Sequence, residues 1–210
     1  MKKSTADRIL DAVVQLYIEN GREGVSIRPI TKMAGCSNVT IFNIFKNKDG
    51  LIEEALRREL SGLDTTIPAR PSDSVERDLE TLARRYFDFY WDNPFIMMVF
   101  PEIMRRRRLQ EILKEEQART IAALVWFYGH HRDRKSWRDD VQVLPLERIN
   151  EEISLPFLGG IYLHVQFAKS DLANPAFDEK LYVRRFLGGW GSRANQADSA
   201  SSEESVSDDS

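Results

Sequence analysis

Apolar residues recur at helical spacing along most of the chain. The first such run places Ile9, Val13, Leu16 and Tyr17 on one face. It ends at Asn20-Gly21, because glycine readily takes the left-handed conformation that closes a helix. No segment alternates apolar and polar residues with a period of two, and no hairpin dipeptide joins two β-rich runs. The pattern therefore predicts an all-α protein.

Capping and proline signals delimit the later helices. Asp73 and Glu76 have the spacing of a capping box, and the helix that they open ends near Asp92-Asn93 because Pro94 disfavours a helical residue before it. Further helical patterns cover residues 95–108, 109–129, 147–169 and 176–189, with a charged loop over 130–145. From about residue 191 the chain is acidic and rich in serine, and we expect this tail to be disordered because it lacks large apolar side chains.

Residues 26–48 predict two short helices joined by a tight turn. Ser26 can cap the first helix, which stops at Ala34-Gly35. Ser37 can cap the second, which covers about residues 38–45. Two short helices across a glycine-containing turn form a helix-turn-helix.

The faces of the second helix follow from its period of about 100° per residue. Ile41 and Phe45 lie together and are assigned to the core. Val39 and Asn43 point away from them, so that the Asn43 amide could bind adenine bidentately and the Val39 and Thr40 methyl groups could contact thymine methyl groups. The flanks hold Thr40 and Ile44 on one side and Asn38 and Phe42 on the other. On spacing alone, the alternative is a solvated surface on a small helical hairpin.

The run AGCSNVTIFNIFKNKDGL, residues 34–51, resembles the helix-turn-helix of the TetR family of bacterial transcriptional regulators. The matched positions begin at Gly24 and end at Leu51. The resemblance implies a three-helix DNA-binding domain over residues 1–60 and an all-helical ligand-binding and dimerisation domain over 61–190, which the tail over 191–210 follows. The partner is then a near-palindromic operator of double-stranded DNA. Lys46 and Lys48 would meet phosphates rather than bases. The candidate DNA-binding residues are Ser26, Arg28, Ser37, Asn38, Val39, Thr40, Phe42, Asn43, Lys46 and Lys48.

Three positions depart from the family's pattern. The family usually has a small residue where Val39 stands, a Tyr where Phe42 stands, and an aromatic residue or His near Ile44. Phe42 keeps the ring but lacks the hydroxyl that tends to reach phosphate in the family, and such a hydrogen bond is worth about 0.5–1.5 kcal/mol. We therefore expect an affinity that is lowered, or recovered through nearby Lys and Arg, and a base preference that favours thymine contacts.

The charge is unevenly distributed. The whole chain has 30 basic and 33 acidic residues, a net charge of −3 that by itself argues weakly against a nucleic-acid partner. Residues 1–60 carry ten basic against eight acidic residues, whereas residues 191–210 carry one against five. Positioned Lys and Arg matter more for DNA binding than the total. The charge therefore suggests moderate non-specific affinity.

Residues 86–100 are rich in aromatic and Met side chains, and Phe87, Tyr90 and Trp91 share one helical face. Spacing alone favours a packed core, whereas the resemblance implies a ligand enclosed between these helices. Aromatic and Met walls suit a hydrophobic or planar small molecule. The candidate ligand-binding residues are Phe87, Tyr90, Trp91, Met98, Met104, Trp126, Phe127 and His164.

Residues 153–169 are apolar nearly all round, which a monomer surface would not tolerate. In the family, the last two long helices pack against the same pair from a second subunit. The resemblance therefore implies a homodimer through the helices at about 147–169 and 176–189. Pro156 either kinks the first of these helices or marks its late start after Ser154.

Other features point to no chemistry. Cys36 is the only cysteine, which excludes an intramolecular disulfide and a thiolate-rich metal site. No catalytic constellation has convincing spacing, and we expect no enzyme activity, cofactor or metal. Arg105–Arg108 are expected to coat a solvated helix face, with an anionic ligand as the alternative. The chain lacks a signal peptide and an apolar run long enough to span a membrane, so we expect a cytoplasmic protein.

Two functions from different classes follow. The first is a homodimeric, ligand-responsive transcriptional repressor. The second is a ligand-binding or interaction module whose helix-turn-helix has lost DNA binding, as suggested by Val39, Phe42 and the overall acidity.

Overall fold

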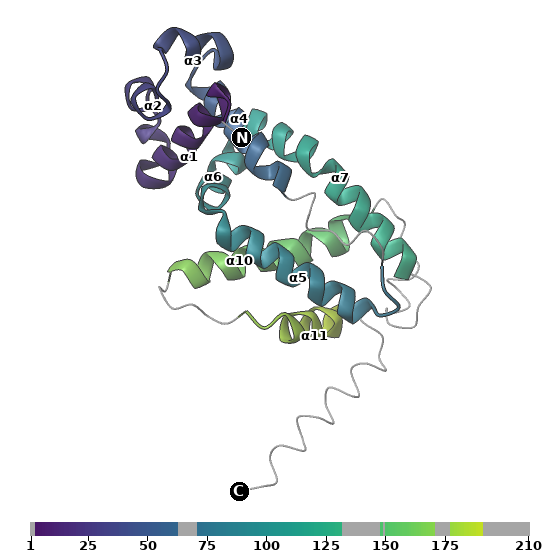
Figure 1. The fold of residues 1–210 in the computed structure, drawn as a ribbon. Helices are drawn as coiled ribbons and strands as arrows, with labels where there is room; N and C mark the ends of the chain where they lie inside the picture. The colour runs from purple at the N-terminus through teal and green to yellow at the C-terminus, as the bar shows by residue number, and fades with distance from the viewer. Residues whose placement is uncertain (1–2, 63–70, 132–147, 149, 171–176, 191–210) are drawn as a thin grey trace, which may run out of the picture. The chain divides into compact units, whose positions relative to one another are not determined.

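The computed structural model describes residues 3–62, 71–131, 148, 150–170 and 177–190, and the regular structure in them is entirely helical (Figure 1). This confirms the all-α prediction. None of the described helices is long and apolar enough to cross a lipid bilayer. The helices are α1 (Thr5–Gly24), α2 (Ile27–Ala34), α3 (Asn38–Phe45), α4 (Lys48–Leu60), α5 (Val75–Asp92), α6 (Pro94–Arg105), α7 (Arg107–His131), a π-helical turn (Asn150–Ser154), α10 (Leu155–Ser170) and α11 (Glu179–Trp190).

The chain divides into two compact units. Unit 1 consists of residues 1–64 and 90–118, and unit 2 consists of residues 65–89 and 119–210. The predicted loop over 130–145 lies outside the described residues from residue 132 onward, and so does the tail over 191–210.

Unit 1 is built around α1, which packs against α2, α4 and α6. A capping box starts α1, because the Asp7 N–H donates to the Ser4 hydroxyl at 3.0 Å and the Asp7 carboxylate accepts from the Ser4 N–H at 3.2 Å. The rings of Tyr17 and Phe95 then meet edge to face, with their centroids 5.1 Å apart. The fully buried apolar residues include Ile9, Val13, Val25, Ile30, Leu51, Leu56, Phe95, Val99 and Ile103.

The first continuous helical run ends at Asn20-Gly21 as predicted, and a short helical turn that was not predicted follows this kink and extends α1 to Gly24. Gly21 interrupts the helical path with φ +62° and ψ −163°, a conformation that glycine adopts at little steric cost. Gly24 is needed for a different reason. A Cβ there would lie only 2.4 Å from the Cβ of Asn20.

Two predicted boundaries between residues 73 and 108 are corrected. The hydroxyl of Ser74, rather than Asp73, accepts from the Arg77 N–H at 3.2 Å, whereas the end of α5 at Asp92 is as predicted. The helix expected over 95–108 stops at Arg105, because Arg106 is extended (φ −117°, ψ 111°) and α7 begins at the next residue. Arg105–Arg108 therefore span a junction between two helices and do not coat one helix face.

Unit 2 has an aromatic core. The rings of Phe87 on α5 and Phe177, which precedes α11, stack with centroids 4.5 Å apart. Gly160 lets α10 approach α11 closely, because a Cβ there would lie 2.5 Å from the hydroxyl of Tyr182. That hydroxyl donates to the carbonyl of Phe157, and burial raises the pKa of Tyr182. Pro156 lies in the first turn of α10, but the π-helical turn Asn150–Ser154 adjoins that helix without a gap, so the helical path does not start at Leu155.

Candidate nucleic-acid interface

Helices α2 and α3 form the predicted helix-turn-helix at one end of unit 1 (Figure 1). Gly35 turns the chain between them in the left-handed conformation (φ 61°, ψ 45°). Ser37 caps α3, because its hydroxyl accepts from the Thr40 N–H at 3.1 Å and lies 2.9 Å from the Thr40 hydroxyl. Ser26 also stands at a helix start, yet its exposed hydroxyl makes no capping hydrogen bond. The predicted cap is therefore present in α3 and absent in α2.

The faces of α3 lie as its period predicts. Ile41 and Phe45 are buried against the rest of unit 1 with 1% and 7% of their surface exposed. Thr40 is half-buried, and the side chains that remain exposed are Asn38, Val39, Phe42, Asn43 and Ile44. Large apolar residues at 66% (Val39) and 49% (Phe42) exposure on an eight-residue helix are unusual for a surface that only meets water.

A tight connection fixes α3 to α4. Lys46 has a positive φ (64°, with ψ −52°), and the Asn47 N–H donates to the Phe45 carbonyl at 2.7 Å, which is the geometry of a classic γ-turn. The Asn47 side chain then caps α4 by accepting from the Gly50 N–H at 2.8 Å. We did not predict this strained turn, because a positive φ at a lysine has no signal in the sequence pattern.

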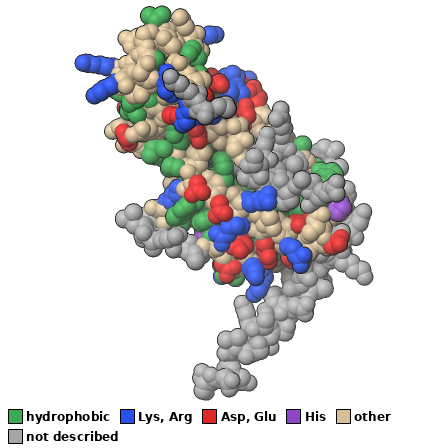
Figure 2. Space-filling view, in the orientation of Figure 1, with side chains coloured by type: hydrophobic (Ala, Val, Ile, Leu, Met, Phe, Trp, Pro, Cys, Tyr) green, Lys and Arg blue, Asp and Glu red, His purple; other side chains and the backbone are tan. Residues whose placement is uncertain are grey.

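The surface around α3 is electropositive. Residues 25–48 contain Arg28, Lys32, Lys46 and Lys48 and no Asp or Glu, in a chain whose net charge is −3. Arg28, Lys32 and Lys46 are exposed, and Lys48 lies 3.9 Å from the Glu23 carboxylate. Figure 2 shows Lys and Arg side chains projecting around the part of unit 1 that carries α2 and α3, with apolar patches between them. Such an arrangement can neutralise phosphates while apolar and amide groups meet base edges.

Ion pairs connect α4 to α1 and to Arg106, between α6 and α7, and they connect α1 to α6 within unit 1. The Asp49 carboxylate contacts the guanidinium of Arg22 and lies 3.3 Å from that of Arg106. Glu102 lies 3.1 Å from Arg22 and accepts a hydrogen bond from the Tyr17 hydroxyl at 2.9 Å. The hydrogen bond from Arg22 lowers the pKa of Asp49, and burial together with this contact to Glu102 raises the pKa of Tyr17. Sequence analysis missed this network because its members lie up to 85 residues apart.

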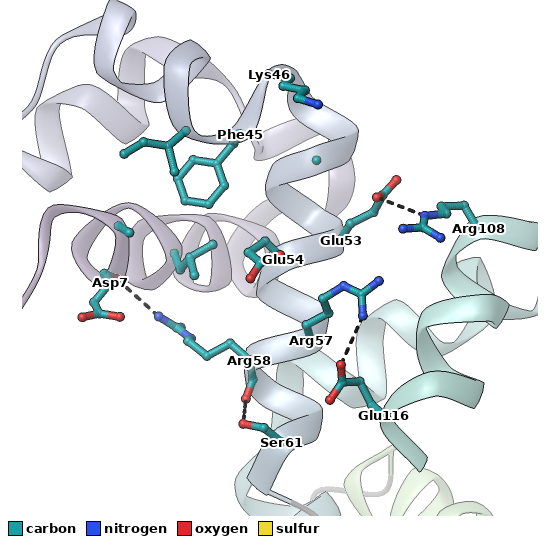
Figure 3. A pocket seen from close by; sticks show the side chains of 14 residues that line it. Asp7, Phe45, Lys46, Glu53, Glu54, Arg57, Arg58, Ser61, Arg108 and Glu116 are labelled. Atoms are coloured by element: carbon teal, nitrogen blue, oxygen red, sulfur yellow. Dashed lines mark hydrogen bonds and ion pairs between the residues drawn. The ribbon is translucent and has the colours of Figure 1, made fainter. Parts of the chain in front are cut away.

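An open groove of about 810 Å³ runs along α4, between it and parts of α1, α3 and α7 (Figure 3). Arg57 lies 2.8 Å from Glu115 and 3.2 Å from Glu116, and Arg108 lies 3.5 Å from Glu53. Arg58 reaches Asp11 at 3.0 Å. The arginines of this groove are thus paired with carboxylates and do not form an anion site.

The candidate ligand-binding residues lie in both units. In unit 1, Tyr90 is buried, Trp91 is half-buried, and Met98 and Met104 are exposed. In unit 2, Phe87 and Phe127 are buried, and Trp126 and His164 are exposed. Within unit 2, the structure brings Phe87 and His164 together with ring centroids 6.1 Å apart. Their role in ligand binding stays a prediction.

Comparisons with known proteins agree with the helix-turn-helix. The family model described as "Bacterial regulatory proteins, tetR family" matches residues 9–55. The chain is 34% identical over 89 residues to the probable HTH-type transcriptional regulator YttP of Bacillus subtilis (strain 168), a match that covers 42% of this chain and 43% of YttP. It is 34% identical over 94 residues to the HTH-type nicotine-responsive transcriptional repressor HdnoR of Paenarthrobacter nicotinovorans, covering 43% of this chain and 47% of HdnoR.

The chain thus spans less than half the length of these curated relatives in each match. Structural similarity covers more of the chain than these sequence matches do. The flavonoid-responsive regulator FrrA has a TM-score of 0.61 with this chain at 25% identity, covering 90% of this chain and 98% of FrrA. The resemblance seen in residues 34–51 is confirmed, and the relatives are regulators rather than enzymes. The N-terminal helix-turn-helix of this chain is thus that of the tetR family of bacterial transcriptional regulators, and the helical fold is similar to that of FrrA over most of the chain.

Proposed function

We propose that this regulator is a repressor that binds a near-palindromic operator as a homodimer and is released by a hydrophobic small molecule. The observation that best supports DNA binding is the exposed face of α3. It lies within residues 25–48, which contain four Lys and Arg residues and no Asp or Glu. In a dimer, two such helices would enter successive major grooves about 34 Å apart. Residues 1–60 would then serve as the DNA-binding domain and residues 61–190 as the ligand-binding and dimerisation domain.

Exposed apolar residues on α10 and α11 support the homodimer. Phe167 is 70% exposed and Leu163, one turn before it, is 53% exposed. Leu155 and Leu181 are also exposed. Large apolar side chains in such number on neighbouring helices are typical of a surface that a second protein covers.

The aromatic side chains of α5 and α7 and the Met residues of α6 support a hydrophobic effector. The similar proteins HdnoR and FrrA are described as nicotine-responsive and flavonoid-responsive, and both of these effectors contain aromatic rings. A planar apolar ligand is therefore the class to screen first. For induction, the ligand must bind more tightly to the conformation that does not bind DNA.

The experiment that tests the proposal is selection of bound fragments from a random DNA pool with the full chain, repeated with planar aromatic compounds. We expect an enriched inverted repeat, and we expect one class of compound to release it. Titration of the enriched fragment at several salt concentrations should show a steep salt dependence. If no fragment is enriched even at low salt, the proposal is wrong.

The exposed apolar residues Val39, Phe42 and Ile44 favour one alternative. A helix-turn-helix that had lost DNA binding could use this surface to bind a protein and retain only its ligand-binding role. Failure to shift any DNA at low salt, together with ligand binding by the full chain, would favour this alternative.

A further inference from the structure

The exposed face of α3 carries an apolar strip formed by Val39 and Phe42. The two residues are three positions apart and therefore neighbours on the helix surface, at 66% and 49% exposure. Asn43 lies one turn after Val39 on the same face. We propose that this strip binds the 5-methyl group of thymine in each operator half-site, so that methyl contacts supply much of the base selectivity. The inference rests on the proposed DNA-binding function and specifies how that function reads sequence.

The chemistry of the major groove favours thymine as the occupant. Among the groups that base pairs present there, the thymine methyl is the apolar one, while the others are hydrogen-bond donors and acceptors. The described side chains of α3 include no Lys, Arg, Asp or Glu, and Asn38 and Asn43 are its exposed amides. A helix with this composition can discriminate by apolar contact and amide hydrogen bonds, but it cannot use the arginine–guanine pairing that is common elsewhere.

The other apolar or methyl-bearing side chains of α3 are placed differently. The Thr40 hydroxyl is engaged by Ser37 at 2.9 Å, and its side chain is half-buried. Ile44 lies on the flank of α3 opposite Phe42, where it lines the groove formed with α1 and α4. The structure therefore revises the sequence-based pairing of Val39 with Thr40, and it assigns the strip to Val39 and Phe42.

The positive charge around the strip favours nucleic acid, rather than an apolar protein surface, as the molecule that binds to it. Four cations and no acid flank it in residues 25–48, and this surface complements a polyanion. The helix is also held rigidly at both ends, by the Ser37 cap and by the close approach of Gly50 to Phe45. A preorganised helix loses little entropy when it enters the groove.

The test uses the operator selected with the full chain and replaces each thymine in turn by deoxyuridine, which removes only the methyl group. We expect Kd to rise about fourfold at one or two positions of a half-site, the effect of one buried methyl-sized group, and about sixteenfold when both half-sites are substituted. At such a position, 5-methylcytosine should bind more tightly than cytosine, because it restores the methyl group.

The variants Val39→Ala and Phe42→Ala connect the effect to the strip. In at least one of these variants, replacing thymine by deoxyuridine should leave Kd nearly unchanged, because the side chain that contacts the methyl group has been removed. Ile44→Ala is the matched control, since it truncates an exposed apolar residue of the same helix and should leave the deoxyuridine pattern unchanged. Circular dichroism checks that each variant keeps its helices.

Three outcomes would overturn the inference. An operator that binds equally well with deoxyuridine at each thymine position has no methyl readout. If deoxyuridine raises Kd as much in Val39→Ala and Phe42→Ala as in the unchanged protein, another residue contacts the methyl group. If the chain selects no DNA at all, the proposed function fails as well, whereas the first two results overturn the inference alone.

Discussion

The carbonyl oxygen of Phe45 lies 2.2 Å from the point where a side chain on Gly50 would place its Cβ. The last residue of α3 is thus in backbone contact with the first turn of α4, and residue 50 must be glycine for the two helices to meet this closely. Because Asp49 on α4 pairs with Arg22 on α1 and with Arg106 after α6, this contact fixes the position of α3 relative to the core of unit 1.

We expect Gly50→Ala to lower the free energy of unfolding by about 1–3 kcal/mol, because the obstructing atom belongs to the backbone and cannot swing aside. Urea unfolding followed by circular dichroism measures the change. A matched control is Gly159→Ala on α10, where a Cβ meets no atom within 4 Å, and which should be neutral or stabilising. Equal stability of Gly50→Ala and the unchanged protein would contradict the close contact.

Lys46 can be probed through its strained backbone. Lys46→Gly and Lys46→Ala remove the same charge, but only glycine relieves the positive φ. We expect the Gly variant to be more stable than the Ala variant by about 1 kcal/mol. Both variants should lose DNA affinity by a similar factor. Thermal unfolding and a mobility-shift titration measure the two effects, and identical melting temperatures would argue against strain at this residue.

Asn43 and Lys48 should affect DNA binding in different ways. Asn43→Ala should cost about 1–3 kcal/mol at one operator base pair and relax the preference there. Lys48→Ala should weaken binding to all sequences about equally and reduce the slope of log K against log salt by about one. Titrations of the operator and its single-base variants at several salt concentrations separate them. Unchanged operator preference in Asn43→Ala would contradict the assigned base contact.

The Arg22–Asp49 pair predicts a pH dependence of stability. The hydrogen bond from Arg22 holds the pKa of Asp49 below its ordinary value of 3.8, so the pair stabilises unit 1 above that pH and is lost as pH falls through the lowered value. Asp49→Asn should reduce the free energy of unfolding by at most about 1 kcal/mol near neutral pH, because the carboxylate is half exposed.

The measurement is urea unfolding of both proteins from about pH 7 down to about pH 2, so that the range extends well below the ordinary pKa of 3.8. The difference between them should shrink toward zero at the acid end, and high salt should reduce it at neutral pH. A difference that stays constant over the whole range would show that the pair contributes no pH-dependent stability.

Phe167 tests the proposed dimer surface. Phe167→Glu places a charge where an apolar side chain is 70% exposed, and we expect a monomer that binds the operator at least tenfold more weakly. Sedimentation velocity reports the oligomeric state. Met33→Glu makes the same change at an exposed apolar residue of α2 and should leave a dimer. A Phe167→Glu protein that remains dimeric would place the dimer interface elsewhere.

The helical class, the two helices around Gly35 and the inward face of Ile41 and Phe45 could be predicted from the sequence. They depend on local signals, which are the 3.6-residue period, a left-handed glycine and a capping serine. Local signals were weaker at helix ends. The extra turn after Gly21 and the break at Arg106 both came from backbone angles that the composition of the segment does not reveal.

Three features became visible only in the folded protein: the positive φ of Lys46, the close contact that requires glycine at residue 50, and the Arg22–Asp49–Glu102 network. Each depends on atoms brought together by packing α1, α4 and α6 around one core, and pairs 80 residues apart leave no periodic trace in a single sequence. The helical period already placed Thr40 and Ile44 on the flank opposite Phe42. Only the structure showed that the Thr40 hydroxyl is engaged by Ser37 and that Ile44 lines the groove along α4, because these contacts depend on neighbouring groups.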